Sequence, residues 1–436
     1  MTSEDSAARA CEPNGQGGVL RDRGFLTFWA SETVSAFGIE LTRLVFPLAA
    51  ILTLRATAFQ VGLLQAFLYA PIIMFSLFIG VWLDRRRRRP SLIVSNATRA
   101  VLIALVPLAS LTSLLSLPML YAIVFLVGTL TLVFEVGSLS YLPSLVERRH
   151  LADANGRIQT SFSLAAIAGP SLGGVLVGVL TAPIALAISA VAFVLSAGIL
   201  SVIRKEEPAP QAAGDRAPIG ASIAEGLRAV FASSMLRSLI TQSSAFNLFW
   251  NALLVVYVVY VVRNLGLSPA QLGFVLGSGA VAALAAAITA NRITRAVGLG
   301  RTLSVATYGC CLPALLLLIP RDASAAAMAL LITAQAALAF HVVVWNVNTL
   351  TLRQVVTPNR VLARMNACYR LVLYGTAPLG ALLGGALGET SGLRNALVIT
   401  VLLLLAPIAW TFFSPVFRLS QMPAGPEEEV YVSPSA

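Results

Sequence analysis

Charged residues are scarce in this chain of 436 residues. Asp, Glu, Lys and Arg make up only 11% of the sequence, whereas a soluble domain carries about 25%. Hydrophobic residues make up 57% of the chain. These proportions exclude a soluble globular protein, and we expect an integral membrane protein.

Cysteines are few, and the sequence motifs of common catalytic sites are absent. The chain has four cysteines, none in a CxxC spacing, and Cys310 and Cys311 are adjacent inside an apolar run. This spacing indicates neither a zinc site nor a disulfide framework. The chain has no Walker loop and no HExxH or GxSxG signature. We therefore expect no metal, no cofactor and no enzymatic activity.

The N-terminus lacks the basic stretch and apolar core of a signal peptide, so the first apolar run has to insert the chain. A helix needs about 20 apolar residues to cross about 30 Å of hydrocarbon. The predicted fold class is therefore an all-α membrane protein. The number and the bounds of its helices follow from the apolar runs of this length. Twelve runs meet the requirement: 26–54, 58–83, 91–114, 118–142, 158–180, 182–203, 238–262, 268–291, 302–320, 323–347, 367–388 and 393–415.

The 30 Lys and Arg residues are unevenly divided between the two sides that these spans define. Lys and Arg that flank a span stay in the cytoplasm. With the N-terminus inside, the inner segments hold 24 of them and the outer loops hold four. Both termini are therefore predicted to be cytoplasmic, in a plasma-membrane protein. The arginines at 85–89 then form the turn between spans 2 and 3 rather than a nucleic-acid contact, because nothing aromatic or extended accompanies them.

Short phrases recur at about half the chain length. QVG at 60–62 returns as QLG at 271–273, and LADAN at 151–155 returns as LARMN at 362–366, both with an offset of 211. Such parallel repeats are typical of transporters that bind substrate at the midplane between two halves. The predicted segments are a cytoplasmic tail (1–25), a first six-helix bundle (26–203), a cytoplasmic linker with an interfacial helix (204–236), a second six-helix bundle (237–416) and an acidic cytoplasmic tail (417–436).

The segment GVWLDRRRRRP at 80–90 resembles the loop signature G-x-x-x-D-R-x-x-R-R of the major facilitator superfamily. Its glycine lets two helices approach closely, its aspartate accepts hydrogen bonds from arginines or helix amides, and its arginines hold the turn at the anionic inner surface. The resemblance implies a gating loop that favours the outward-open state; a plain cytoplasmic turn would carry the same arginines. The gating residues are Gly80, Asp84, Arg85, Arg88, Arg89 and, further along span 3, Arg99.

Two glycine-rich spans extend the resemblance. Gly169, Pro170, Gly173 and Gly174 match the GPxxGG motif that, in this superfamily, accompanies exporters working as antiporters; the alternative is a plain packing motif. In span 11, small residues recur at every fourth position, so spans 5 and 11 are expected to face each other or adjacent helices. The chain thus resembles the exporter branch that includes enterobactin exporters and macrolide efflux proteins. The glycines of span 11 are Gly380, Gly384 and Gly388.

A few charged residues fall inside predicted spans, where an ionised side chain costs at least about 2.5–3.5 kcal/mol. Glu32, Glu40 and Arg43 lie on span 1 and Glu135 on span 4. A carboxylate held away from water takes up a proton more readily, which suits proton coupling. The alternatives are an ion pair between Glu40 and Arg43, a wet Glu32 near the interface, and a gating pair between Glu135 and Arg99.

Polar and aromatic residues in the second half indicate a lining for a bulky substrate. The resemblance implies that spans 1, 4, 7 and 10 surround the cavity. His341 is a further candidate proton carrier, although a neutral histidine bonded across helices is an equal reading. The predicted lining residues are Arg43, Asn247, Trp250, Asn251, Trp345, Asn346 and Asn348.

These observations predict a monomeric, proton-driven efflux transporter that exports a bulky organic compound, such as an antibiotic or siderophore, by alternating access. Its expected partners are the lipid bilayer, a small organic substrate and protons, with no nucleic acid. The alternative is a proton-coupled uptake symporter for a small metabolite. The direction of substrate flux in vesicles separates the two.

Overall fold

The computed structural model describes residues 19–147, 150–205, 225, 227–228 and 230–419. Within these ranges the chain is helical and free of strands, and twelve of its helical stretches are long and apolar enough to cross a membrane. The predicted all-α class and the number of spans are confirmed. The first six spans are α2 (Arg23–Leu52), α3 (Ala58–Asp84), α4 (Arg88–Leu111), α5 (Leu117–Leu145), α6 (Leu151–Val179) and α7 (Ala182–Val202).

Two spans of the second half are broken helices. Pro313 and Pro407 stand second in the segments that follow each break, and proline cannot donate the backbone hydrogen bond that would continue the preceding helix. The predicted continuous spans 302–320 and 393–415 are therefore each two elements. The second-half elements are α9 (Ser234–Arg263), α10 (Pro269–Val297), α11 (Leu299–Cys311) with the 3-10 helix η4 (Leu312–Leu318), α12 (Ala325–Val356), α13 (Asn359–Thr390), α14 (Leu393–Leu404) and α15 (Ala406–Phe413).

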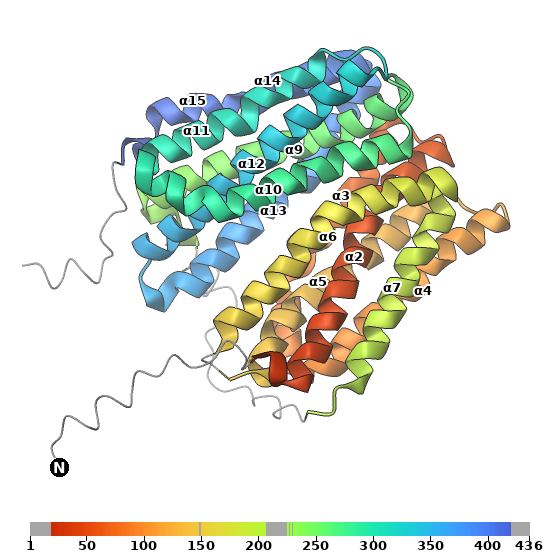
Figure 1. Ribbon diagram of the computed structural model, residues 1–436, viewed down its shortest axis with the longest axis horizontal. Helices are drawn as coiled ribbons and strands as arrows, with labels where there is room; N and C mark the ends of the chain where they lie inside the picture. Colours follow the sequence, from red (N-terminus) through yellow and green to blue (C-terminus); the bar gives the residue numbers. More distant parts are fainter. Residues whose placement is uncertain (1–18, 148–149, 206–224, 226, 229, 420–436) are drawn as a thin grey trace, which may run out of the picture.

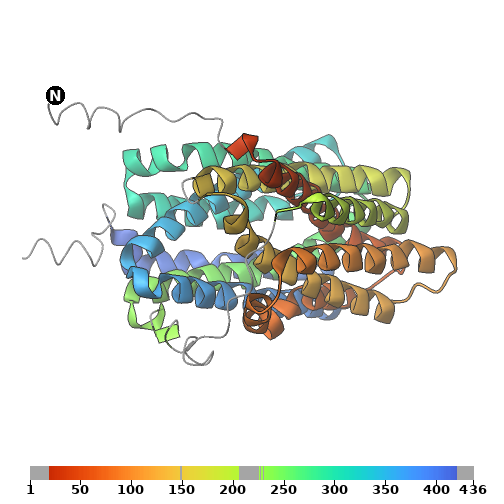
Figure 2. The same cartoon turned by 90° about the horizontal axis from the view of Figure 1, so that it is seen from below.

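The helices form two bundles, α2–α7 and α9–α15, that lie side by side (Figures 1 and 2). Within the first bundle, α2 packs against α6 and α7, while α4 packs against α5 and α7. The bundles meet mainly where α3 packs against α13 and where α6 packs against α10. In Figure 1 they come together at the upper right and diverge toward the lower left.

Because successive spans alternate in direction, the chain has two distinct ends. The closed end carries the turns at 53–57, 264–268 and 391–392. The basic end carries the arginines at 85–89 and the turn at 298. At the closed end, Arg263 of the second bundle donates a hydrogen bond to the carbonyl of Ala56 at 2.6 Å, which joins the two halves.

The repeated phrases occupy equivalent places in the two bundles. Thr57 and Gln60 form a capping box at the start of α3, in which the Gln60 side chain accepts from the Thr57 amide at 2.8 Å. Ser268 and Gln271 form the same box at the start of α10, also at 2.8 Å and 211 residues later. The recurring glutamine therefore begins the same helix in each half, since it satisfies an otherwise free amide.

The recurring glycines form the contact between the halves. A Cβ atom at Gly62 would lie 3.0 Å from the Cα of Gly385, and one at Gly174 would lie 2.9 Å from the Cα of Gly273. Only glycine allows backbones to approach this closely. Of the two expectations for spans 5 and 11, the one in which they pack on adjacent helices is confirmed: α6 lies against α2 and α10, and α13 against α9 and α3.

Two expectations for the gating loop have different outcomes. The predicted close helix contact at Gly80 is wrong, because a Cβ atom there would meet no heavy atom within 4 Å. Gly80 lies near the basic end of α3, on a side with open space, although the neighbouring Ile79 and Leu83 are buried against α5. Asp84 is the last residue of α3, and its side chain lies outside the described part of the chain.

The predicted linker and tails lie largely outside the described residues. The first 18 residues, residues 206–224 and residues 420–436 are not among the described residues. Of the predicted interfacial helix, residues 230–232 are helical, and Val230 is buried in an apolar cluster with Leu236 and Leu239. This part of the linker therefore packs against the second bundle.

Candidate functional site

Charged side chains from three helices lie within the first bundle and make up a charged cluster: Glu32, Glu40 and Arg43 of α2, Arg99 of α4 and Glu135 of α5. The predicted pair on α2 is confirmed, because Arg43 Nη1 donates to Glu40 Oε1 at 2.6 Å. Both side chains are partly exposed, so this pair contributes little to stability by itself.

The first glycine of the GPxxGG segment makes room for this pair. A Cβ atom at Gly169 of α6 would lie 2.5 Å from the Cβ of Glu40, too close for any other residue. Gly173, one turn further along α6, has only ordinary contacts with Leu44 and Val45. The glycine segment therefore connects the charged cluster at Gly169 with the interface between the halves at Gly174.

Arg99 is fully buried among neutral groups. Its guanidinium carbon lies 4.7 Å from the ring centre of Phe134 and 4.4 Å from that of Phe193. Its nitrogens donate to the Asn96 side chain and, at 3.3 Å, to Thr131. Stacking and hydrogen bonding of this kind suit a planar guanidinium better than an ammonium group.

No direct ion pair holds Arg99 within the part of the chain that the structure describes. The alternative of a Glu135–Arg99 gating pair is wrong as a contact in this conformation, because the guanidinium is taken up by aromatic rings and neutral oxygens. Glu32 and Glu135 nevertheless both act electrostatically on Arg99, from two different helices. Both carboxyl groups are therefore candidates to balance the charge of Arg99.

Glu32 is buried, with only 2% of its surface exposed, so the reading of a wet residue at the interface is wrong. The helices around α2 cover it: the neighbouring Ser31 lies 2.7 Å, oxygen to oxygen, from Ser196 of α7. Glu32 Oε1 has no hydrogen-bond partner among the described residues. Burial of a carboxylate oxygen without a donor is costly, so Glu32 is a functional candidate rather than a solvated residue.

A small cavity of about 60 Å³ joins two parts of the charged cluster. Arg43, Tyr69, Thr131 and Glu135 contribute polar atoms to its lining, and Phe193 contributes an aromatic wall. The volume has room for about two water molecules beside these polar groups. The cavity therefore lies between Arg43 of α2 and Glu135 of α5.

The structure adds residues that the sequence reasoning missed. Asn96 Nδ2 donates to Ser196 Oγ at 2.7 Å, which links Arg99 of α4 through α7 to Ser31 of α2. Asn96 stands three residues before Arg99 on the same helix, and this spacing would have indicated that the two side chains interact. Nothing in the sequence identified Phe134 and Phe193 as the two aromatic partners.

Several predicted lining residues of the second half are held by local contacts. Trp345 and Asn348 are buried: Trp345 Nε1 donates to Ser243 at 3.3 Å, and Asn348 Oδ1 accepts from Thr294 at 2.8 Å. Trp345 thus belongs to the core of the second bundle.

On α9, Asn251 Nδ2 donates to the Asn247 carbonyl at 2.8 Å, and Asn247 Oδ1 accepts from Thr376 of α13 at 3.1 Å. Trp250 is half-buried and stacks on Phe246 with 6.4 Å between ring centres. Asn346 of α12 is exposed.

His341 of α12 faces α11. A Cβ atom at Gly309 of α11 would overlap the imidazole ring, so the glycine provides the space that the ring fills. His341 Nδ1 lies 2.7 Å from the Ala337 carbonyl of its own helix. This arrangement favours a histidine that packs between α11 and α12.

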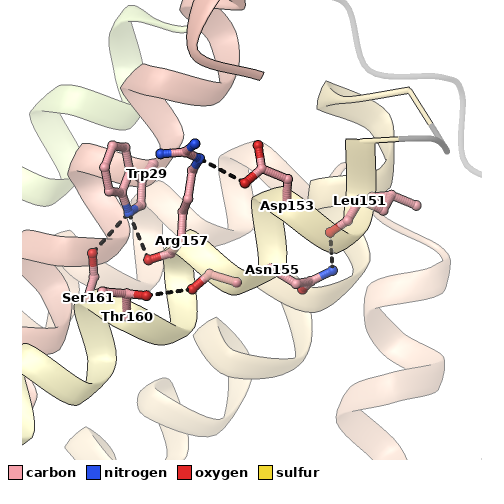
Figure 3. A network of polar contacts seen from close by, with 8 residues as sticks. Trp29, Leu151, Asp153, Asn155, Arg157, Thr160 and Ser161 are labelled. Atoms are coloured by element: carbon pink, nitrogen blue, oxygen red, sulfur yellow. Dashed lines mark hydrogen bonds and ion pairs between the residues drawn. The ribbon is translucent and has the colours of Figure 1, made fainter. Parts of the chain in front are cut away.

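The LADAN segment begins α6, and the residues that follow it are bonded to Trp29 of α2 (Figure 3). Asp153 accepts from Arg157 Nε at 3.1 Å, and the indole of Trp29 donates to the Arg157 carbonyl at 3.2 Å and to Ser161 Oγ at 2.9 Å. These contacts tie the basic end of α6 to the first bundle, while its other end contacts α10 of the second.

The fold, the repeat and the buried charges all describe a two-bundle membrane carrier. A model of the transmembrane secretion effector family matches residues 18–431. The chain belongs to this family. As a transmembrane secretion effector it is a transporter of the major facilitator superfamily, resembling that superfamily's exporters, and not an enzyme.

The sequence of this chain is similar to those of multidrug efflux pumps, and its fold is similar to those of solved transporters. It is 25% identical over 389 residues to the multidrug efflux pump Tap of Mycolicibacterium fortuitum, covering 85% of this chain and 90% of that one. It is 26% identical over 404 residues to Tap of Mycobacterium tuberculosis, covering 90% and 92%.

Its fold is similar to that of a mutant of the nucleoside transporter NupG, with a TM-score of 0.73, 11% identity and coverage of 90% and 99%. It is also similar to a bacterial homologue of the iron transporter ferroportin in an inward-facing state, with a TM-score of 0.70, 15% identity and coverage of 90% and 98%.

Proposed function

We propose that this transporter exports a bulky, amphipathic organic compound such as an antibiotic in exchange for protons. The similarity to multidrug efflux pumps over most of the chain supports export. The position of Gly169 against Glu40 supports antiport, because it connects the exporter-type glycine segment with an intramembrane carboxylate. A siderophore is the second cargo class that such a carrier would suit.

We propose that both termini are cytoplasmic, as the distribution of arginines predicts. The basic end then faces the cytoplasm and the closed end faces outward. The contact of Gly174 with Gly273 at the closed end supports an inward-facing conformation, in which the path to the outside is shut. We propose a monomer, because each chain holds two complete bundles.

The observation that carries the coupling proposal is that Arg99 is fully buried between Phe134 and Phe193 without a direct ion pair to a described residue, in the same bundle as the buried Glu32. The cluster contains two guanidinium groups and three carboxyl groups. Glu40 and Arg43 neutralise each other at 2.6 Å. One of the two remaining carboxylates neutralises Arg99, and the other carries one exchangeable proton.

This proton connects transport to the membrane gradient. A proton that enters from outside gains about 2.3 kcal/mol per 100 mV, together with any pH gradient. Protonation of one carboxylate frees Arg99 to approach the other, which changes the packing of α4 against α5 and α7. We propose that this change favours the inward-facing state, and that proton release into the cytoplasm resets it.

We propose that the substrate binds between the bundles, where exposed and half-buried polar and aromatic side chains are available. Arg43, Trp250 and Asn346 are the strongest candidates. The remaining lining candidates act as supports, because their side chains form hydrogen bonds to neighbouring helices or to their own helix: Asn247, Asn251, Trp345 and Asn348. His341 is assigned a packing role against Gly309.

Transport into inside-out membrane vesicles tests the proposal. With a panel of antibiotics, dyes and siderophores, acidification of the vesicle interior should drive at least one compound inward through the intact protein. Glu32→Gln and Glu135→Gln should remove this dependence on the pH gradient. Glu389→Gln, an exposed carboxylate at the closed end, is the matched control and should transport normally. Movement of substrate together with protons would instead identify an uptake symporter.

A further inference from the structure

A second cavity, of about 860 Å³, lies at the basic end of the first bundle, outside the charged cluster. We propose that it binds one anionic phospholipid, with the phosphate on the α3–α4 turn and an acyl chain along the groove beside it. Three arginines line its polar part: Arg85, Arg86 and Arg87. Its apolar part is lined by Trp82, Val94, Leu130 and Val133.

The three arginines carry positive charge that no carboxylate among the described residues neutralises. All three are exposed, and none of them forms an ion pair with a described residue. Arg86 lies over the Trp82 ring at 5.3 Å from its centre, which holds this guanidinium at the edge of the groove. Guanidinium groups bind phosphate oxygens in pairs, so the turn is suited to a phosphate diester.

The start of α4 adds to this preference for an anion. Arg87 caps the helix without a side-chain hydrogen bond, and the first turn holds no acidic residue. Its first amides therefore retain a partial positive charge directed toward the same turn. The partial charge of these amides would favour any anion. The preference for a lipid comes from the apolar groove beside them.

The groove is apolar and faces outward from the bundle. Among the described helices, α4 packs mainly on α5 and α7, which leaves its remaining face free. Val94, about two turns beyond the arginines, is 61% exposed, and Trp82 is 43% exposed. In a membrane this face meets hydrocarbon. The arginines at one end of the groove can bind the phosphate of a phospholipid while the apolar part holds an acyl chain.

The experiment measures binding of defined lipids to the purified full-length protein by native mass spectrometry. Phosphatidylglycerol is the anionic probe, phosphatidylcholine the zwitterionic probe and glycerol phosphate the soluble headgroup. Each arginine near an anionic lipid surface accounts for about a fivefold change in affinity, so the triple variant R85Q/R86Q/R87Q should bind phosphatidylglycerol about 100-fold more weakly.

Two further variants separate charge from shape. The triple variant R292Q/R295Q/R301Q removes the same charge at the corresponding turn of the second bundle, where all three arginines are exposed, and should bind phosphatidylglycerol normally. Val94→Trp fills the groove and keeps every arginine, so it should weaken phosphatidylglycerol binding at least tenfold. Folding of each variant is checked by its thermal transition.

Three results would overturn the proposal. One is equal binding of phosphatidylglycerol and phosphatidylcholine to the intact protein. Another is binding of glycerol phosphate as tight as that of phosphatidylglycerol, which would indicate a soluble-anion site. The third is an equal loss of affinity in the two arginine triples, which would indicate general surface charge.

Discussion

Gly174 of α6 lies backbone to backbone against Gly273 of α10: a Cβ atom on either would stand within 3.0 Å of the other's Cα. The pair at Gly62 and Gly385 repeats this contact on α3 and α13, and both partners are displaced by 211 residues. The halves are therefore joined at the closed end by two equivalent contacts, which can open and close by one rigid movement.

A methyl group at Gly174 should open the closed end. In Gly174→Ala the new Cβ overlaps the Pro269 carbonyl, and overpacking of this kind costs about 1–3 kcal/mol. Because the cost falls only on the closed arrangement, the conformational equilibrium should shift about 5- to 150-fold toward the open one.

The distance between spin labels at Arg55 and Ser268, both exposed at the closed end, measures this shift. Gly178→Ala is the matched control, because its Cβ would come no closer than 3.9 Å to Ala270. Identical distance distributions in the two variants would mean that the glycine contact does not hold the halves together.

Gly169→Ala should impair transport without disturbing the interface between the halves. Its methyl group would press on the Cβ of Glu40 at 2.5 Å and displace the Glu40–Arg43 pair. Gly173→Ala meets Leu44 at an ordinary 3.4 Å and should transport normally. The efflux rate and its dependence on the pH gradient are measured for both. Equal rates would show that the motif serves packing alone.

Removal of the buried cation should destabilise the protein, and removal of a carboxylate should compensate in part. Arg99→Gln leaves Glu32 and Glu135 without a shared cation, and breaking a buried charge arrangement costs about 3–5 kcal/mol. Adding Glu32→Gln should restore about 1 kcal/mol or more, because residues in one electrostatic network are not additive.

Thermal unfolding of the purified protein in detergent measures this compensation. Arg364→Gln removes an exposed arginine that is paired with Glu225 and should change stability by less than about 0.5 kcal/mol. If the effects of Arg99→Gln and Glu32→Gln simply add, the two side chains do not act on each other.

His341→Gln should keep proton-dependent efflux. The imidazole is packed into the space at Gly309, and the substitution leaves every carboxyl group of the charged cluster in place. Gly309→Ala, in contrast, should destabilise the second bundle by about 1–3 kcal/mol, since its methyl group overlaps the ring. If transport by His341→Gln no longer responds to the pH gradient, the histidine takes part in proton coupling.

Long apolar runs made the helices predictable, because a lipid environment permits few structures other than a continuous helix. The breaks at Pro313 and Pro407 were missed, since other prolines, such as Pro170, stay inside unbroken helices. Whether a proline interrupts a helix depends on its neighbours, which the run of apolar residues does not specify.

The charged cluster was predictable as a set of residues, but its contacts were not. Glu40 and Arg43 share one helix, so their spacing alone predicted the pair. The aromatic partners of Arg99 come from α5 and α7, and only the packing of three helices brings Phe134 and Phe193 onto its guanidinium. Trp345 and Asn348 show the same limit: polar residues on one helix do not reveal which face meets the cavity.

Proton release on substrate binding tests the central claim most directly. The purified protein in weakly buffered detergent is mixed with a compound that it exports, and the pH change is recorded. If Glu32 and Glu135 share one exchangeable proton beside Arg99, the intact protein should release up to one proton per chain, and Glu32→Gln and Glu135→Gln should release markedly less. Undiminished release from the double variant Glu32→Gln/Glu135→Gln would contradict the account.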